Sequence, residues 1–114
     1  MGLFGKSKEK KSEKLCEKGG KLISQEKYEE AISCYDKVIA FEDPYHSESA
    51  LFDKGTTLFQ LERYEEAIAC YDEVNKGVPE YLEGWNLKGH ALKKLGREKE
   101  AEECFAKAKE LDES

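Results

Sequence analysis

The sequence contains four cysteines, which are the first candidates for binding a metal or acting as nucleophiles. Cys34, Cys70 and Cys104 recur 36 and then 34 residues apart, and no Cys-x-x-Cys pair or cysteine–histidine cluster provides the close spacing of a zinc site. A free cysteine packs like a small apolar residue. We therefore expect these three thiols to be buried, reduced and metal-free. Cys16 lies outside this register and is expected to be more exposed.

The two histidines, His46 and His90, are the candidates for acid–base chemistry. A hydrolytic site needs a nucleophile, a base within reach of it and a group that orients the base. Neither histidine has such partners at a recognisable spacing, and His90 is better explained as part of a binding surface. We therefore predict that the chain is not an enzyme and uses no cofactor and no metal.

A twelve-residue segment, KYEEAISCYDKV at residues 27–38, recurs as RYEEAIACYDEV at residues 63–74 with nine of the twelve positions identical. A weaker third copy, REKEAEECFAKA, spans residues 97–108 and keeps the alanine, the cysteine and an aromatic residue. Self-similarity at a fixed period of this length is typical of stacked repeat proteins. We therefore expect three copies of one structural unit.

Each copy is predicted to be a helical hairpin. Gly19, Gly55 and Gly89 each have a large apolar residue four positions before and a leucine three positions after, which places them on one stripe of an α-helix. A short turn follows, and the second helix opens with acidic residues, which favour a helix N-terminus. Its inner stripe repeats at i, i+4 and i+7: Ala31, Tyr35 and Val38; Ala67, Tyr71 and Val74; Ala101, Phe105 and Ala108. Glycine on one helix and alanine on the other indicate that the two backbones approach closely.

Charge is unevenly distributed along the chain. The net charge is −6, but residues 1–18 carry six lysines and three glutamates, so the rest of the chain is strongly acidic. An acidic body argues against nucleic-acid binding, which depends on neutralising phosphates. No apolar run reaches membrane-spanning length, and no signal sequence is recognisable. We therefore expect a cytoplasmic protein that binds neither nucleic acid nor membrane, with residues 1–11 as a flexible basic tail.

The pattern resembles the tetratricopeptide repeat, a helix–turn–helix unit of 34 residues. The third copy matches the family positions most fully, at Trp85, Gly89, Leu92, Gly96, Arg97, Ala101, Phe105 and Ala108. The resemblance implies an all-α solenoid of three stacked antiparallel helix–turn–helix hairpins, forming a segment of a right-handed superhelix. The repeats are assigned to residues 12–47, 48–81 and 82–114. Lysines stand where the family usually has leucine, and we expect them to bury their aliphatic stems while their ammonium groups stay in solvent: Lys18, Lys54 and Lys88.

The resemblance also implies an adaptor that binds a segment of a partner protein in a concave groove lined by the first helices. Helical geometry predicts which side chains face this groove: Cys16, Ile23, Phe52, Asp53, Thr56, Phe59, Asn86, Leu87, His90 and Lys93. Phe52 and Phe59 would form an exposed apolar patch, and such patches usually mark partner sites. The alternative is that neighbouring helices partly cover them.

Two further points concern the partner. The best-known subgroup of the family clamps the acidic C-terminal tails of heat-shock chaperones with lysine, asparagine and arginine. None of the matching positions supplies a fitting side chain: Cys16, Gly20, Asp53, Glu83 and Leu87.

The alternative function is self-assembly into a weak homo-oligomer, because no further helix covers the third repeat and this repeat is free to stack on another copy.

Overall fold

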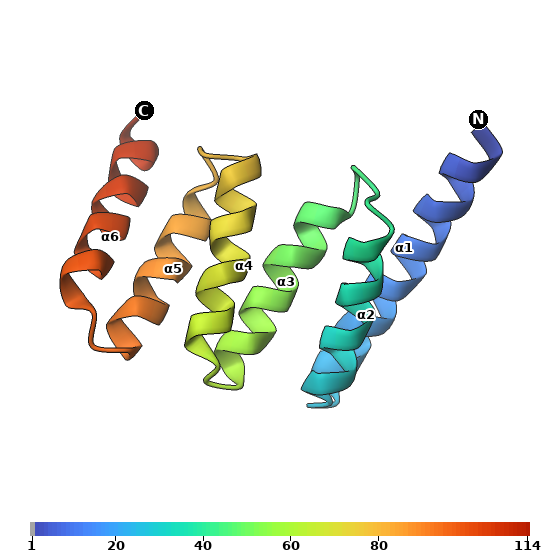
Figure 1. The fold of residues 1–114 in the computed structure, drawn as a ribbon, viewed down its shortest axis with the longest axis horizontal. Coiled ribbons are helices and arrows are strands. Elements are labelled where there is room, and N and C mark those ends of the chain that lie inside the picture. The colour runs from blue at the N-terminus through green and yellow to red at the C-terminus, as the bar shows by residue number, and fades with distance from the viewer. Residues whose placement is uncertain (1) are drawn as a thin grey trace.

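The computed structural model describes the backbone of residues 2–114 and the side chains of residues 7–114. It contains six helices and, within these residues, no strand (Figure 1): α1 (Gly2–Ser24), α2 (Tyr28–Ala40), α3 (Ser47–Gln60), α4 (Tyr64–Gly77), α5 (Leu82–Lys94) and α6 (Glu98–Glu113). They form three antiparallel hairpins that stack side by side, and each helix packs mainly against its neighbours in sequence. This arrangement confirms the predicted all-α solenoid. None of the described helices is long and apolar enough to span a membrane.

Helix α1 differs from the expectation for the N-terminus. The sequence analysis expected a frayed tail through residue 11, whereas α1 continues without a break to Gly2. The segment contains no proline and is rich in lysine and glutamate, which have high helix propensity. Adding turns to an existing helix is much easier than nucleating a new one. The first repeat therefore provides a nucleus from which the helix extends through this basic segment.

The turn inside each hairpin has the same geometry in all three repeats. Glu26, Glu62 and Gly96 occupy equivalent positions and have φ values of 60°, 60° and 77°. The residue after each of them donates its backbone N–H to a carbonyl five residues back, as Lys27 N does to Leu22 O at 2.8 Å. This is the Schellman motif, which ends a helix with one left-handed residue. Two of the three turns place a glutamate in this conformation, although glycine adopts it more readily.

The glycine of each first helix makes room for an aromatic ring of the second helix. A Cβ added at Gly19 would lie 2.7 Å from Tyr35 Cζ, and one added at Gly55 would lie 2.9 Å from Tyr71 Cε1. Gly89 faces the Phe105 ring in the same way. The sequence analysis attributed these glycines to close approach of two backbones. The structure shows instead that they accommodate the aromatic residues of the inner stripe, of which Tyr35 and Tyr71 are buried and Phe105 is half-buried.

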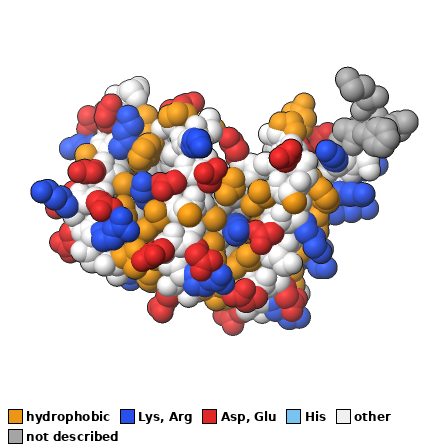
Figure 2. Space-filling model, viewed as in Figure 1, with side chains coloured by type: hydrophobic (Ala, Val, Ile, Leu, Met, Phe, Trp, Pro, Cys, Tyr) orange, Lys and Arg blue, Asp and Glu red, His pale blue; other side chains and the backbone are white. Residues whose placement is uncertain are grey.

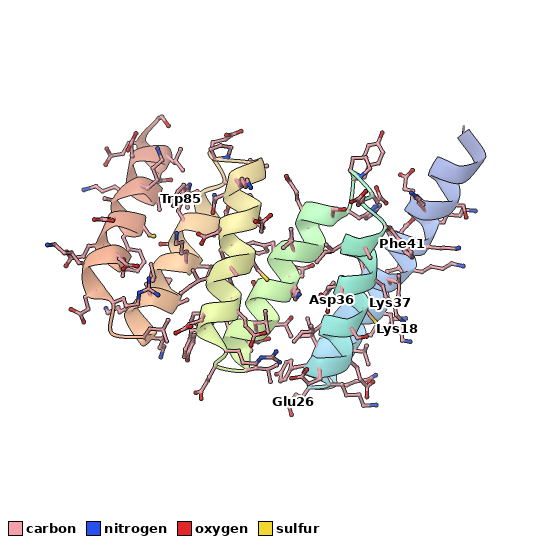
Figure 3. The ribbon with its side chains drawn as sticks, in the orientation of Figure 1. Lys18, Glu26, Asp36, Lys37, Phe41 and Trp85 are labelled. Carbon is pink, nitrogen blue, oxygen red and sulfur yellow. The ribbon has the colours of Figure 1, made fainter. Side chains whose placement is uncertain are left out.

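Successive repeats are joined by an apolar contact and an ion pair. Ile32 of α2 packs into the core of the second repeat, and Ile68 of α4 packs into the core of the third. Asp36 lies on the side of α2 that faces α3 (Figure 3), and its Oδ1 is 2.6 Å from Lys54 Nζ. Lys88 Nζ is likewise 2.6 Å from an aspartate Oδ1 of α4. The lysines at these positions therefore have half-buried stems and end on carboxylates of the preceding repeat.

Candidate functional site

A pocket lies at one end of the row formed by the first helices α1, α3 and α5. It has a volume of about 710 Å³ and is open to solvent. Residues from three helices line it: Phe59 of α3; Leu87, His90, Lys93 and Lys94 of α5; and Glu98 of α6. Its floor is therefore apolar, and its rim carries two lysines and a histidine against one glutamate. Such a pocket can accept an apolar side chain that lies next to an acidic group.

Four of the sequence-predicted groove residues meet in this pocket: Phe59, Leu87, His90 and Lys93. They come from two successive repeats, so the pocket exists only because α3 and α5 lie side by side. The His90 ring packs edge-on against Phe105, with 5.0 Å between the ring centroids. His90 therefore lies between the groove and the core of the third hairpin.

Phe52 is less free than the sequence analysis expected. Its ring centroid lies 5.9 Å from that of Tyr71 and 5.3 Å from that of Tyr81. Phe59 similarly packs edge-on against Tyr64, at 5.1 Å. Both phenylalanines are half-buried, which agrees with the alternative that neighbouring helices partly cover them. The covering rings come from the start of α4, from its middle and from the turn before α5: Tyr64, Tyr71 and Tyr81.

The remaining groove positions of the second and third repeats, Asp53, Thr56 and Asn86, are also half-buried. The Thr56 hydroxyl donates to Phe52 O at 3.1 Å and lies 3.3 Å from Tyr71 Oη, so it bridges the groove surface and the core. Burial raises the pKa of the Asp53 carboxyl. This part of the groove is therefore polar and acidic, in contrast to the basic rim of the pocket.

The groove residues predicted in the first repeat lie elsewhere. Cys16 and Ile23 pack, half-buried, against the core of the first hairpin and do not reach the pocket. Burial is the main cause that raises the pKa of the Cys16 thiol, and the charge of Asp53 adds to it. Cys16 therefore borders the acidic part of the groove.

Two residues that matter at the groove were not identified from sequence. Glu98 begins α6, and it reaches the pocket because only a tight turn separates it from Lys94. The short spacing between Lys94 and Glu98 in the sequence could have identified Glu98 as a groove residue. Tyr81 precedes α5 and covers Phe52 of the preceding repeat, a contact for which the sequence offers no local signal.

His46 has a structural role in the loop between the first two repeats. Its Nδ1 lies 2.9 Å from Asp43 Oδ2, and Asp43 Oδ1 accepts the backbone N–H of Tyr45 at 2.8 Å. Burial acts to raise the pKa of the Asp43 carboxyl, but these hydrogen bonds outweigh it and hold the pKa below its usual value. Among the described residues there is no group of three or more histidine, cysteine or acidic side chains placed to hold a metal ion.

Comparison with known families identifies the fold. Residues 23–108, three quarters of the chain, match the model of the tetratricopeptide-repeat family described as anaphase-promoting complex, cyclosome, subunit 3. The chain belongs to this family. Its three hairpins are tetratricopeptide repeats, as the sequence pattern predicted.

Solved tetratricopeptide-repeat domains share the whole architecture. The first such domain of Spaghetti (RPAP3), solved with the HSP90 peptide SRMEEVD, has 28% identity and a TM-score of 0.81, over 92% of this chain and 82% of that one. The first domain of human RPAP3 has 27% identity and a TM-score of 0.79, over 90% and 80%. MamA from Desulfovibrio magneticus RS-1 has 27% identity and a TM-score of 0.78, over 89% and 56%. Among curated proteins, no significant match is found.

The cysteines of this tetratricopeptide-repeat chain differ in accessibility, which leads to a prediction for thiol labelling. Cys34, Cys70 and Cys104 are only 5%, 6% and 6% exposed, whereas Cys16 is half-buried. Burial raises the pKa of Cys16, Cys70 and Cys104 alike, so the difference in exposure sets the order of reaction. We expect a thiol reagent to modify Cys16 first in the native protein and the other three only on unfolding. Peptide mass mapping after brief labelling measures this order, and early modification of Cys70 would contradict it.

Proposed function

We propose that the chain binds a peptide segment of a partner protein in the groove of its first helices, with the main anchor in the pocket between Phe59 and Leu87. The observation that carries this proposal is the composition of that pocket. It joins an apolar floor from two repeats to a rim formed by His90, Lys93 and Lys94. We expect the bound segment to place an apolar side chain on the floor and an acidic side chain beside the rim.

The fold supports this proposal, because the Spaghetti domain of the same architecture was solved with a bound peptide. That peptide, SRMEEVD, is described as an HSP90 peptide. The present chain lacks the residues expected for a chaperone tail, since acids stand at Asp53 and Glu83 where a basic or amide side chain is needed. We therefore propose a different partner, recognised by its apolar anchor at the third repeat.

The apolar floor and the charged rim of the pocket should contribute differently to the binding affinity. An aromatic or aliphatic anchor in a desolvated pocket commonly contributes about 2 kcal/mol, roughly thirtyfold in affinity. A charge on an exposed rim mainly changes the association rate and its salt dependence. Phe52, which packs on two tyrosines, is expected to contribute more to stability than to binding.

A display library of random peptides tests the proposal without a known partner. The library is selected on the wild-type protein and depleted on the variant Leu87→Glu, and we expect the enriched peptides to share an apolar residue next to aspartate or glutamate. Their affinity should fall roughly thirtyfold for Phe59→Ala and several-fold, in a salt-dependent way, for Lys93→Glu.

Tyr45→Ala is the matched control, because Tyr45 is an aromatic residue that is 76% exposed and lies outside the groove. It should bind the selected peptides as wild type does. Peptides that bind wild type, Phe59→Ala and Leu87→Glu equally would place the binding surface elsewhere. Melting curves of each variant separate lost binding from lost folding.

A further inference from the structure

The groove passes from the first repeat to the second before it reaches the pocket between α3 and α5. Residues of α3 and α5 correspond at an offset of 34 along the chain. Leu87 and Lys93, which line the pocket, therefore correspond to Asp53 and Phe59 one repeat earlier. A carboxylate thus occupies the place of the apolar floor residue, and an aromatic ring the place of the basic rim residue. The two parts of the groove are suited to different side chains.

Asp53 has no cation beside it. It is half-buried and makes no ion pair with any side chain that the structure describes. Burial raises the pKa of Cys16, Tyr35 and Tyr81, which belong to three different elements, and the negative charge of Asp53 adds to the rise in each case. The groups around Asp53 are therefore neutral or acidic, and Glu83 adds a further negative charge beside Tyr81.

This lack of a cation is unusual for the molecule. On the face shown in Figure 2, acidic and basic side chains lie next to each other over most of the surface. Inside the stack, the aspartates of α2 and α4 each pair with a lysine of the following helix at 2.6 Å. Partial burial makes the charged form of a carboxylate costly, and a cation nearby offsets that cost. Asp53 would therefore gain from a positive group that enters the groove.

The hydroxyl of Tyr35 is a second polar group without a partner at the same place. Tyr35 is only 2% exposed, and its Oη lies 3.0 Å from a Cβ built on Gly19 of α1. The equivalent hydroxyl of Tyr71 lies 3.3 Å from Thr56 Oγ1. In the first repeat the threonine position is Gly20, which has no side chain, and Tyr35 Oη makes no hydrogen bond with the described residues. A hydroxyl oxygen can accept a hydrogen bond from an ammonium or guanidinium group.

We propose that this part of the groove is a second subsite, which binds a lysine or arginine side chain of the bound peptide. The cationic group pairs with the Asp53 carboxylate and donates a hydrogen bond to the Tyr35 hydroxyl. The inference rests on the proposed peptide binding and adds the charge of a second anchor. Neighbouring helices pack about 8–10 Å apart, and an extended chain advances about 3.3 Å per residue. The basic residue should therefore stand about three residues from the apolar anchor.

Selection from the random-peptide library on the wild-type protein, followed by affinity measurements on synthetic peptides, tests the inference. We expect peptides that depend on Phe59 to carry a lysine or arginine about three residues from the apolar residue. For such a peptide, Asp53→Asn should lower the affinity about tenfold, because a half-buried ion pair and its hydrogen bond are lost. Tyr35→Phe removes one hydrogen bond and should lower the affinity about threefold.

The second arm of the experiment changes the peptide. Replacing its basic residue with norleucine should weaken binding about tenfold to the wild-type protein and leave binding to Asp53→Asn unchanged, as a double-mutant cycle requires for a direct pair. Asp53→Lys should instead prefer peptides with glutamate at this position. Glu73→Gln is the matched control, because it removes one carboxylate from an exposed position of α4. It has the same net charge as Asp53→Asn and should bind the peptides as wild type does.

The outcomes separate this inference from the proposed function. Peptides that require Phe59 and Leu87 but bind wild type and Asp53→Asn equally would overturn the second subsite and leave the pocket intact. An apolar or acidic residue at the second position of the selected peptides would also overturn it, as would an equal loss of affinity in Glu73→Gln. If no selected peptide depends on Phe59 or Leu87, both proposals fail. Melting curves confirm that each variant is folded before its affinity is compared.

Discussion

Replacing Tyr71 with alanine is expected to lower the free energy of unfolding by about 3–5 kcal/mol, as for other fully buried aromatic side chains. Tyr71 has no exposed surface, and its ring fills the space beside Gly55. It also supports Phe52 of the groove and reaches Thr56 with its hydroxyl. Removing the ring therefore leaves a cavity that joins the core of the central repeat to the groove. Small domains have a total stability on the order of 5–15 kcal/mol, so this variant should lose a large part of its stability and unfold at a clearly lower temperature than wild type.

Two variants control this prediction in urea or thermal unfolding. Tyr71→Phe keeps the ring and removes only the contact with Thr56, so its cost should be about 0.5–1.5 kcal/mol. Tyr45→Ala removes a tyrosine that is 76% exposed and should change stability by less than about 0.5 kcal/mol. Similar losses for Tyr71→Ala and Tyr45→Ala would show that the central core is not packed around Tyr71.

Gly19→Ala and Gly20→Ala, at adjacent positions of α1, are expected to change stability in opposite directions. A Cβ at position 19 would lie 2.7 Å from Cζ of Tyr35, whose ring is only 2% exposed and cannot move aside easily. Overpacking of this kind costs about 1–3 kcal/mol, which exceeds the helix-propensity gain of about 0.5–1 kcal/mol. At position 20 no atom lies within 4 Å of the added Cβ. Gly20→Ala should therefore gain helix propensity without any cost from overpacking, and so stabilise the protein.

Urea unfolding followed by far-ultraviolet circular dichroism measures both changes on the same helix. Stabilisation by both substitutions would mean that Tyr35 does not occupy the space above Gly19. Destabilisation by Gly20→Ala would mean that this face of α1 is covered in solution.

The local part of the architecture follows from the sequence. Three copies of one pattern, each with a glycine stripe and an alanine–aromatic stripe, predict three helical hairpins, because side-chain periodicity along a helix is a local property. The burial of Cys34, Cys70 and Cys104 follows from the same register. The extent of α1 differs from the expectation, because the helix continues to Gly2 through a basic segment of high helix propensity.

The candidate site depends on contacts between repeats, and the periodicity of the sequence does not reveal these contacts. The groove face of α3 could be listed from sequence, but covering of Phe52 by Tyr81 requires the position of the next repeat. The pocket of Phe59, Leu87 and Lys93 likewise requires the spacing between α3 and α5. Side chains that lie far apart along the chain meet only when hairpins stack at a particular angle. Sequence therefore determined which faces each helix presents, and tertiary packing decided which of those faces meet and which remain open to a partner.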